Sequence, residues 1–133
     1  MTNIIQLAIA LIFLAETERG LVPYDNKGKL QITQGFVDDV NRISRKQFTR
    51  LDRLDFGKSC EMAHIWLNHY KPLVERKTGK TMNEYDLAVM FNVGMNGYLR
   101  GDGAEYRAMI ERKLALLNPS DALLVALNRK ERV

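Results

Sequence analysis

Two acidic residues at the end of an apolar run are the clearest candidates for chemistry in this chain. Residues 4–15 are almost entirely aliphatic or aromatic, and Glu16 and Glu18 follow directly. A carboxyl group placed there is partly removed from water and lies near the negative end of the helix dipole, and both effects disfavour its charged form. A glutamic acid that keeps its proton can donate it to a leaving glycosidic oxygen.

Helical phase does not choose between the two acids. Each has aliphatic residues four and seven positions before it, namely Ile12 and Ile9 for Glu16. An alternative interpretation is that both carboxylates are solvated at a frayed helix end. On this helix alone both interpretations remain open.

A second carboxyl group would decide the type of reaction. Hydrolytic glycosidases use two carboxyl groups that lie about 5–9.5 Å apart. Asp25, nine residues beyond Glu16, is the candidate for the second. However, residues 25–28 also form a good turn sequence with aspartate in its favoured place, so Asp25 is equally interpretable as a turn residue.

The apolar spacing predicts a mainly helical fold, with about six helices around a buried N-terminal helix. Thr2 or Asn3 can cap the first helix, and Gly20 is suited to its end. Turn formers dominate residues 23–28, and we expect a small extended or hairpin element near residues 21–35. The glycines from Gly94 onward interrupt the helical pattern. The predicted helices cover residues 4–19, 37–43, 59–74, 83–92 and 104–117, with a short one after Ser120.

Composition predicts one domain, residues 1–133, because a chain of 133 residues with 46% hydrophobic content can bury a single core. The net charge of +4 favours a polyanionic partner such as nucleic acid, anionic lipid or bacterial wall.

Residues 4–15 are too short to span a bilayer and lack a basic flank, so we expect no cleaved leader. Cys60 is interpreted as a packed thiol. His64 and His69 are poorly spaced for a metal, and we expect neither metal nor cofactor.

Three motifs in order resemble the lysozyme-like superfamily of peptidoglycan-cleaving enzymes. They are similar above all to the lytic transglycosylases, the related goose-type lysozymes and their small phage relatives. Residues 15–17 resemble the end of the family's catalytic helix, residues 28–33 its Gly-Leu-Met-Gln-Ile element, and residues 91–98 its Ala-Tyr-Asn-Ala-Gly-Pro-Gly segment. Residues 39–43, 52–55 and 66–70 are similar to a phage and bacterial subgroup. The resemblance covers roughly residues 9–112.

The resemblance implies an α+β lysozyme-like domain with Glu16 as the general acid. It also implies that five residues bind substrate: Gln31, Thr33, Asn92, Gly94 and Tyr98. Each has a structural alternative, because Gln31 and Thr33 suit an ordinary strand and the glycines suit a helix end followed by a turn. The family uses one Glu first to protonate the leaving oxygen and then to deprotonate the sugar's own 6-hydroxyl, which closes onto C1.

The implied function is cleavage of the β-1,4 bond between N-acetylmuramic acid and N-acetylglucosamine, by lytic transglycosylase or muramidase chemistry. We expect a monomer that acts on peptidoglycan of the bacterial cell wall, reached by holin-dependent export or by carriage in a phage virion. One alternative is a catalytically silent wall-binding or virion structural protein. Another is a small nucleic-acid-binding domain built on the basic residues 42–50, although Asp38, Asp39, Asp52 and Asp55 reduce the local field.

Overall fold

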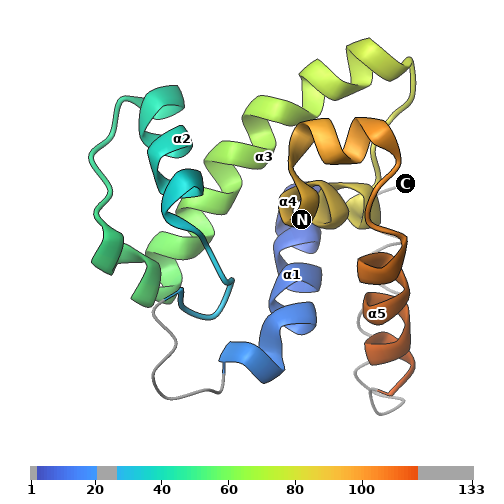
Figure 1. The fold of residues 1–133 in the computed structure, drawn as a ribbon, viewed down its shortest axis with the longest axis horizontal. Helices are drawn as coiled ribbons and strands as arrows, with labels where there is room; N and C mark the ends of the chain where they lie inside the picture. The colour runs from blue at the N-terminus through green and yellow to red at the C-terminus, as the bar shows by residue number, and fades with distance from the viewer. Residues whose placement is uncertain (1–2, 21–26, 117–133) are drawn as a thin grey trace. The chain divides into compact units, whose positions relative to one another are not determined.

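The computed structural model describes residues 3–20 and 27–116, and the side chains of all of these except residues 17–20. This part of the chain is helical, which confirms the mainly helical prediction (Figure 1). Asp25 and the helix predicted after Ser120 lie outside the described residues. The elements are α1 (Ile4–Gly20), α2 (Gln34–Ser44), the 3-10 helix η1 (Arg50–Leu54), α3 (Phe56–Thr78), α4 (Glu84–Arg100) and α5 (Ala104–Ala115).

The chain divides into two compact units. The first unit comprises residues 1–15 and 83–133, and the second unit comprises residues 16–82. Helix α1 therefore contributes most of its length to the first unit and its last turn to the second.

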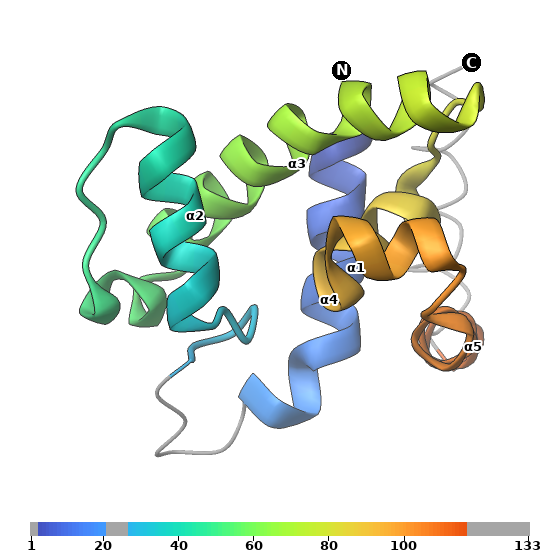
Figure 2. The same cartoon turned by 45° about the horizontal axis from the view of Figure 1, so that its top comes forward.

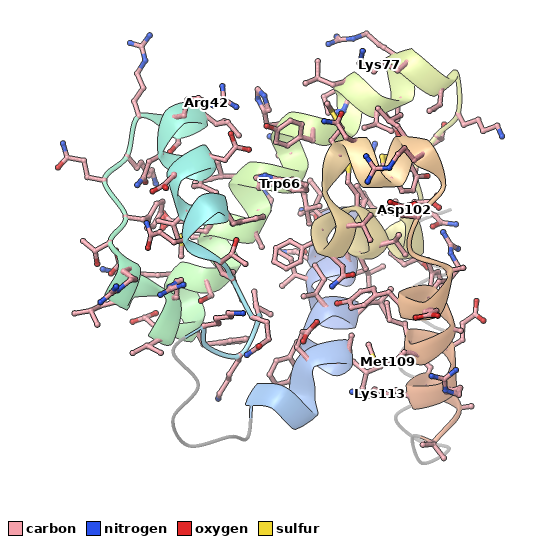
Figure 3. The ribbon with its side chains drawn as sticks, viewed as in Figure 1. Arg42, Trp66, Lys77, Asp102, Met109 and Lys113 are labelled. Carbon is pink, nitrogen blue, oxygen red and sulfur yellow. The ribbon has the colours of Figure 1, made fainter. Side chains whose placement is uncertain are left out.

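In the first unit, α1 buries most of its circumference. Gln6, Ala10 and Phe13, spaced four and three residues apart, form its exposed stripe. Helix α5 is tied to α1 by Lys113, whose Nζ donates to the carbonyls of Leu14 (3.2 Å) and Ala15 (2.7 Å); Figure 3 shows Lys113 on the side of α5 that faces α1. A cation on these carbonyls offsets the negative end of the helix dipole.

The turn between α4 and α5 depends on glycine. Gly103 has φ +103°, and a Cβ built on it would lie 2.3 Å from Val89 Cγ1. Only a residue without a side chain allows α5 to start this close to α4. Arg107 of α5 forms an ion pair with Asp86 of α4, and Asp86 also completes a capping box with Asn83.

Gly94 interrupts α4, as the sequence predicted. The glycines from Gly94 onward were expected to break the helical pattern, and the dihedral angles of Gly94 are non-helical, so that α4 consists of two helical segments joined at a kink. The second segment was not expected from the sequence; it continues to Arg100, and Gly101 provides its left-handed cap. Gly97 is buried within this second segment. Glycine lowers helix propensity by only about 1 kcal/mol, which packing on the rest of the unit can offset.

In the second unit, α2 lies along the first half of α3, as both ribbon views show (Figures 1 and 2). Val37 and Val40 form the buried side of α2. Helix α3 continues through Pro72 to Thr78, although the proline was expected to fray its end. Pro72 is exposed, so the carbonyl that loses its partner can be hydrated, while Val74 in the next turn is fully buried.

The described part of the predicted extended or hairpin element is a turn, so that prediction is corrected for residues 27–33. Ile32 N donates to Lys27 O (3.1 Å) and Gln31 N donates to Gly28 O (3.1 Å). Gly28 and Gln31 both have positive φ, at +73° and +56°, which curls the chain. Leu30 and Ile32 are still both buried, at 0% and 1% exposure, and no strand occurs in the described residues.

The contact of α2 with α3 is centred on a carboxylate that accepts from an aromatic pair. Asp39 accepts hydrogen bonds from Trp66 Nε1 (3.0 Å), the Tyr70 hydroxyl (2.7 Å) and the Arg42 guanidinium (2.6 Å). Phe36 adds a ring contact with Trp66, at 5.1 Å between centroids. Burial raises the pKa of Asp39, but the hydrogen bonds from Tyr70, Arg42 and Trp66 and the charge of Arg42 together hold it below its usual value.

Replacing Asp39 by asparagine should lower the free energy of unfolding by about 1–2 kcal/mol near neutral pH, because charge-assisted hydrogen bonds are lost. The pKa of Asp39 is lower in the folded state than in the unfolded state, where it is about 3.8, so the ionised carboxylate stabilises the fold above that pH. This stabilisation is lost as pH falls through the folded pKa. The difference in the free energy of unfolding between wild type and D39N should therefore shrink below about pH 4. Urea unfolding followed by the fluorescence of Trp66, the single tryptophan, measures it.

Asp38→Asn is the matched control for this prediction. Asp38 is exposed on α2 and accepts a hydrogen bond from Gln34 (2.9 Å), so its replacement should change stability by less than about 0.5 kcal/mol. Equal losses in the two variants, or a loss in D39N that persists at low pH, would contradict the role assigned to the Asp39 carboxylate.

Candidate functional site

Glu16 is a buried acid in the last part of α1. Its exposure is 3%, and it continues a row of buried positions that begins with Ile5, Ala8 and Ile12, at spacings of three and four residues. The structure thus assigns burial to Glu16, which helical phase alone could not do. Glu18 lies two residues further along the helical backbone, and its side chain lies outside the described part.

The surroundings of Glu16 follow from the sequence of α1. The helix contains no charged residue before Glu16, so its buried row is apolar up to that point. The carboxyl group then lies within the last five residues of the helix, where carbonyl groups without intrahelical partners concentrate negative charge. Burial disfavours the charged form of a carboxyl group, and the neutral form is the one that a proton donor needs. The Lys113 ammonium on the carbonyls of Leu14 and Ala15 offsets the helix dipole at this end of α1.

Gln31 and Thr33 have local structural roles that the sequence did not show. The side chain of Gln31 donates to Gly28 O (2.9 Å) within its own turn. Thr33 is the N-cap of α2, and its hydroxyl accepts from Phe36 N (3.2 Å). Neither residue lies in a strand, so the strand alternative for both is wrong. The capping pattern of a Thr before Gln34 and Gly35 was the signal for the second role.

Gly94 interrupts α4 within the segment that resembles the family's third motif. Its φ of +81° and ψ of +167° lie in a region that is essentially restricted to glycine. A Cβ built there would meet nothing within 4 Å, so the backbone borders open space at this point. Asn92, two residues earlier, is exposed. The interruption therefore presents backbone and an amide side chain where a ligand could approach closely.

Tyr98 is only partly accessible. Burial raises the pKa of Tyr98, and the neighbouring Asp86 carboxylate raises it further. Asp86 is also the partner of Arg107, so Tyr98 belongs to the same polar cluster that joins α4 to α5. Its phenol therefore has a structural role in this cluster, and its role in binding a sugar ring stays a prediction.

The predicted site residues fall into two groups. Glu16, Gln31 and Thr33 belong to the second unit, and Asn92, Gly94 and Tyr98 belong to the first. Asp25 lies outside the described residues.

Two further polar features, a buried glutamate and a partly buried cluster, were not proposed as sites from the sequence. Glu84, at 3% exposure, lies in the first turn of α4, where a negative charge is favoured by the helix dipole. The Asp39 cluster was signalled by Asp39 and Arg42 at a spacing of three and by Trp66 and Tyr70 at a spacing of four. Both features support the fold of their own unit.

No group of three or more His, Cys, Asp or Glu side chains in the described part of the chain could hold a metal ion. None of the helices there combines the length and the apolar character that crossing a membrane requires.

Comparison of the chain with protein-family models, with curated proteins and with solved structures found no match.

Proposed function

We propose that this protein cleaves peptidoglycan glycan strands at the β-1,4 bond between N-acetylmuramic acid and N-acetylglucosamine, with Glu16 as the general acid. The observation that carries the proposal is the burial of Glu16, at 3% exposure, at the end of an apolar helix. A carboxyl group in such a place favours its neutral form and can protonate a leaving oxygen. The order of the three motifs along the chain supports a lysozyme-like domain as the framework.

In the first step, Glu16 gives its proton to the bridging oxygen as the bond from that oxygen to C1 of the muramic acid breaks. In the transglycosylase route, the resulting Glu16 carboxylate takes the proton of the 6-hydroxyl of the same sugar. The hydroxyl oxygen then bonds to C1 and closes a 1,6-anhydro ring. This route needs one carboxyl group on the protein and no water.

In the hydrolytic route, water replaces the 6-hydroxyl as the nucleophile. A second carboxyl group, at about 5–9.5 Å from the first, usually stabilises the developing cation or activates the water. Asp25 is the candidate in this sequence. The two routes differ in their products, so they can be separated without knowledge of the residues involved.

The interruption of α4 supports binding of an extended saccharide. The dihedral angles of Gly94 exclude a side chain, and open space lies where its Cβ would be. Backbone amide and carbonyl groups can therefore approach sugar hydroxyl and N-acetyl groups closely, and Asn92 adds a side-chain amide that both donates and accepts. In this proposal we assign Asn92 and Gly94 to saccharide binding by the first unit.

Purified wall sacculi provide the test. The full-length protein should release soluble muropeptides, and reduction of these products with borohydride should distinguish the routes. Free sugar ends from hydrolysis react with borohydride, whereas 1,6-anhydro ends do not. Mass spectrometry before and after reduction measures both products.

Two outcomes of this experiment would contradict the proposal. Binding to sacculi without any soluble product would favour the catalytically silent wall-binding protein. The absence of both binding and product would remove peptidoglycan as the substrate altogether.

A further inference from the structure

We propose that η1 and the start of α3 form a surface that binds the interface of an anionic phospholipid membrane. This proposal does not depend on the proposed enzymatic function. It rests on three exposed side chains, Leu51 at 73%, Leu54 at 55% and Phe56 at 42%, which we call the apolar knob. The described residues include six large hydrophobic side chains that are exposed, and half of them lie in this stretch.

The knob residues are connected through η1 and the turn at Gly28 and Lys29. Residues three apart are eclipsed in a 3-10 helix, so Leu51 and Leu54 project along the same edge of η1. The turn at Gly28 lies against Leu54, because a Cβ built on Gly28 would be 3.6 Å from Leu54 Cα. Lys29, next to Gly28, places its Nζ 5.6 Å from the centre of the Phe56 ring. Apolar and cationic groups are therefore adjacent.

A buried arginine holds the knob rigidly. Arg53, at 5% exposure, donates to Ile32 O (3.2 Å) and to Arg50 O (3.0 Å). Ser59 in turn donates to Arg53 O (2.8 Å), which anchors η1 on α3. Because Arg53 is bound on the inner side, Leu51 and Leu54 are held outward. A rigid surface loses little conformational entropy when it binds.

The charge around the knob is net positive. Residues 27–33 and 45–58 carry seven basic residues and two acidic ones. Of the basic residues, Arg53 is buried, Lys58 pairs with Asp52 and Lys46 pairs with Glu61. Asp52 accepts from Thr49 N and Lys58 Nζ, and Asp55 caps α3 by accepting from Lys58 N. Both acids are thus engaged within the protein, while Lys29 and Arg50 are exposed. An anionic surface should be attracted to this region.

The combination of the knob with a basic border favours a lipid headgroup layer over other anionic partners. A nucleic acid would pair with the cations but would leave the leucine side chains in contact with polar phosphate and sugar groups. A second copy of the chain that used the same surface would bring two basic borders together and be repelled. A membrane interface offers phosphate groups to the cations and acyl chains to the knob.

Sedimentation of the full-length protein with lipid vesicles tests the proposal. We expect binding to phosphatidylcholine vesicles that contain about one quarter phosphatidylglycerol, weaker binding to pure phosphatidylcholine, and weakening by salt. The double variant Leu51→Ser/Leu54→Ser should bind at least about tenfold more weakly, because two buried leucines are lost. Lys29→Gln/Arg50→Gln should reduce binding to the anionic vesicles by roughly tenfold and leave binding to neutral vesicles unchanged.

Leu99→Ser is the matched control, since Leu99 is an exposed leucine of α4, at 38%, in the other unit. It should bind vesicles like wild type, and circular dichroism should show all variants folded. The proposal is overturned if wild type does not bind anionic vesicles or if L51S/L54S binds equally well. It is also overturned if these leucines instead control self-association, or if the protein binds duplex DNA through Lys29 and Arg50 with no vesicle binding.

Discussion

Replacing Glu16 by glutamine should reduce the release of muropeptides from sacculi by at least about 10²–10⁴-fold, the range that a positioned general acid contributes. Glutamine has nearly the same shape as glutamic acid but has no acidic proton to give to the leaving oxygen. The loss should appear in kcat, because proton transfer belongs to the chemical step rather than to binding. Soluble product formed per unit time is the measurement.

Glutamine at position 16 removes the acidic proton with little change in packing. Because Glu16 is 3% exposed, a change in size would disturb the packing of α1, whereas glutamine keeps the volume and the hydrogen-bonding oxygen. The variant should therefore keep the helical circular dichroism of wild type and should still bind sacculi. Retained binding with lost product formation separates a catalytic role from a structural one.

Glu18→Gln is the control that the sequence itself provides. Glu18 lies on the same helix two residues further on, and this variant should retain most of the wild-type rate. If Glu18→Gln were inactive and Glu16→Gln active, the assignment of the general acid would move to Glu18. If both variants cleaved sacculi at the wild-type rate, neither acid would be the proton donor.

Replacing Gly28 by alanine should lower the free energy of unfolding by about 2–4 kcal/mol, the largest stability effect we expect from a single methyl group in this protein. A Cβ on Gly28 would lie 1.9 Å from Arg53 O, far inside any allowed contact, and φ is +73° there. The obstructing atom is backbone and cannot rotate away. Relief requires the 27–33 turn to move off η1, which would break the bond from Arg53 to Ile32 O.

Gly35→Ala is the matched control for Gly28→Ala. Gly35 lies in the first turn of α2, and a Cβ there would meet nothing within 4 Å. Alanine at such a helical position should leave stability unchanged or raise it by about 0.5–1 kcal/mol. Urea unfolding monitored by Trp66 fluorescence compares the two variants in one unit. Equal stabilities for both would show that the turn is not pressed against η1.

Local patterns predicted the helices well where one apolar face was enough. The first helix was expected over residues 4–19 and spans Ile4–Gly20, and the helix expected over residues 104–117 spans Ala104–Ala115. Periodicity is a property of neighbouring residues, so it can be recognised without knowledge of the partner helix.

Proline and glycine differed in how well they predicted helix ends. Gly94 was expected to break the helical pattern, and α4 is kinked there with non-helical dihedral angles. Pro72 was expected to fray the end of its helix, but α3 continues beyond it to Thr78. The intrinsic cost of a proline inside a helix is a few kcal/mol, and burial of Val74 in the next turn offsets it. Propensity measured on an isolated helix cannot include that contribution.

The sequence by itself determined that an apolar helix near the N-terminus ends in acids, and that the chain is mainly helical, because both depend on residues close together. Only the tertiary structure decided that Glu16 continues the buried row of α1 and that residues 27–33 curl into a turn against η1. It also decided that Asp39 joins α2 to α3 and that Leu51 and Leu54 remain outside. These outcomes depend on which segments, distant in sequence, pack together and exclude water from a side chain. Hydrophobic burial between such segments leaves no pattern in the neighbouring residues of either one.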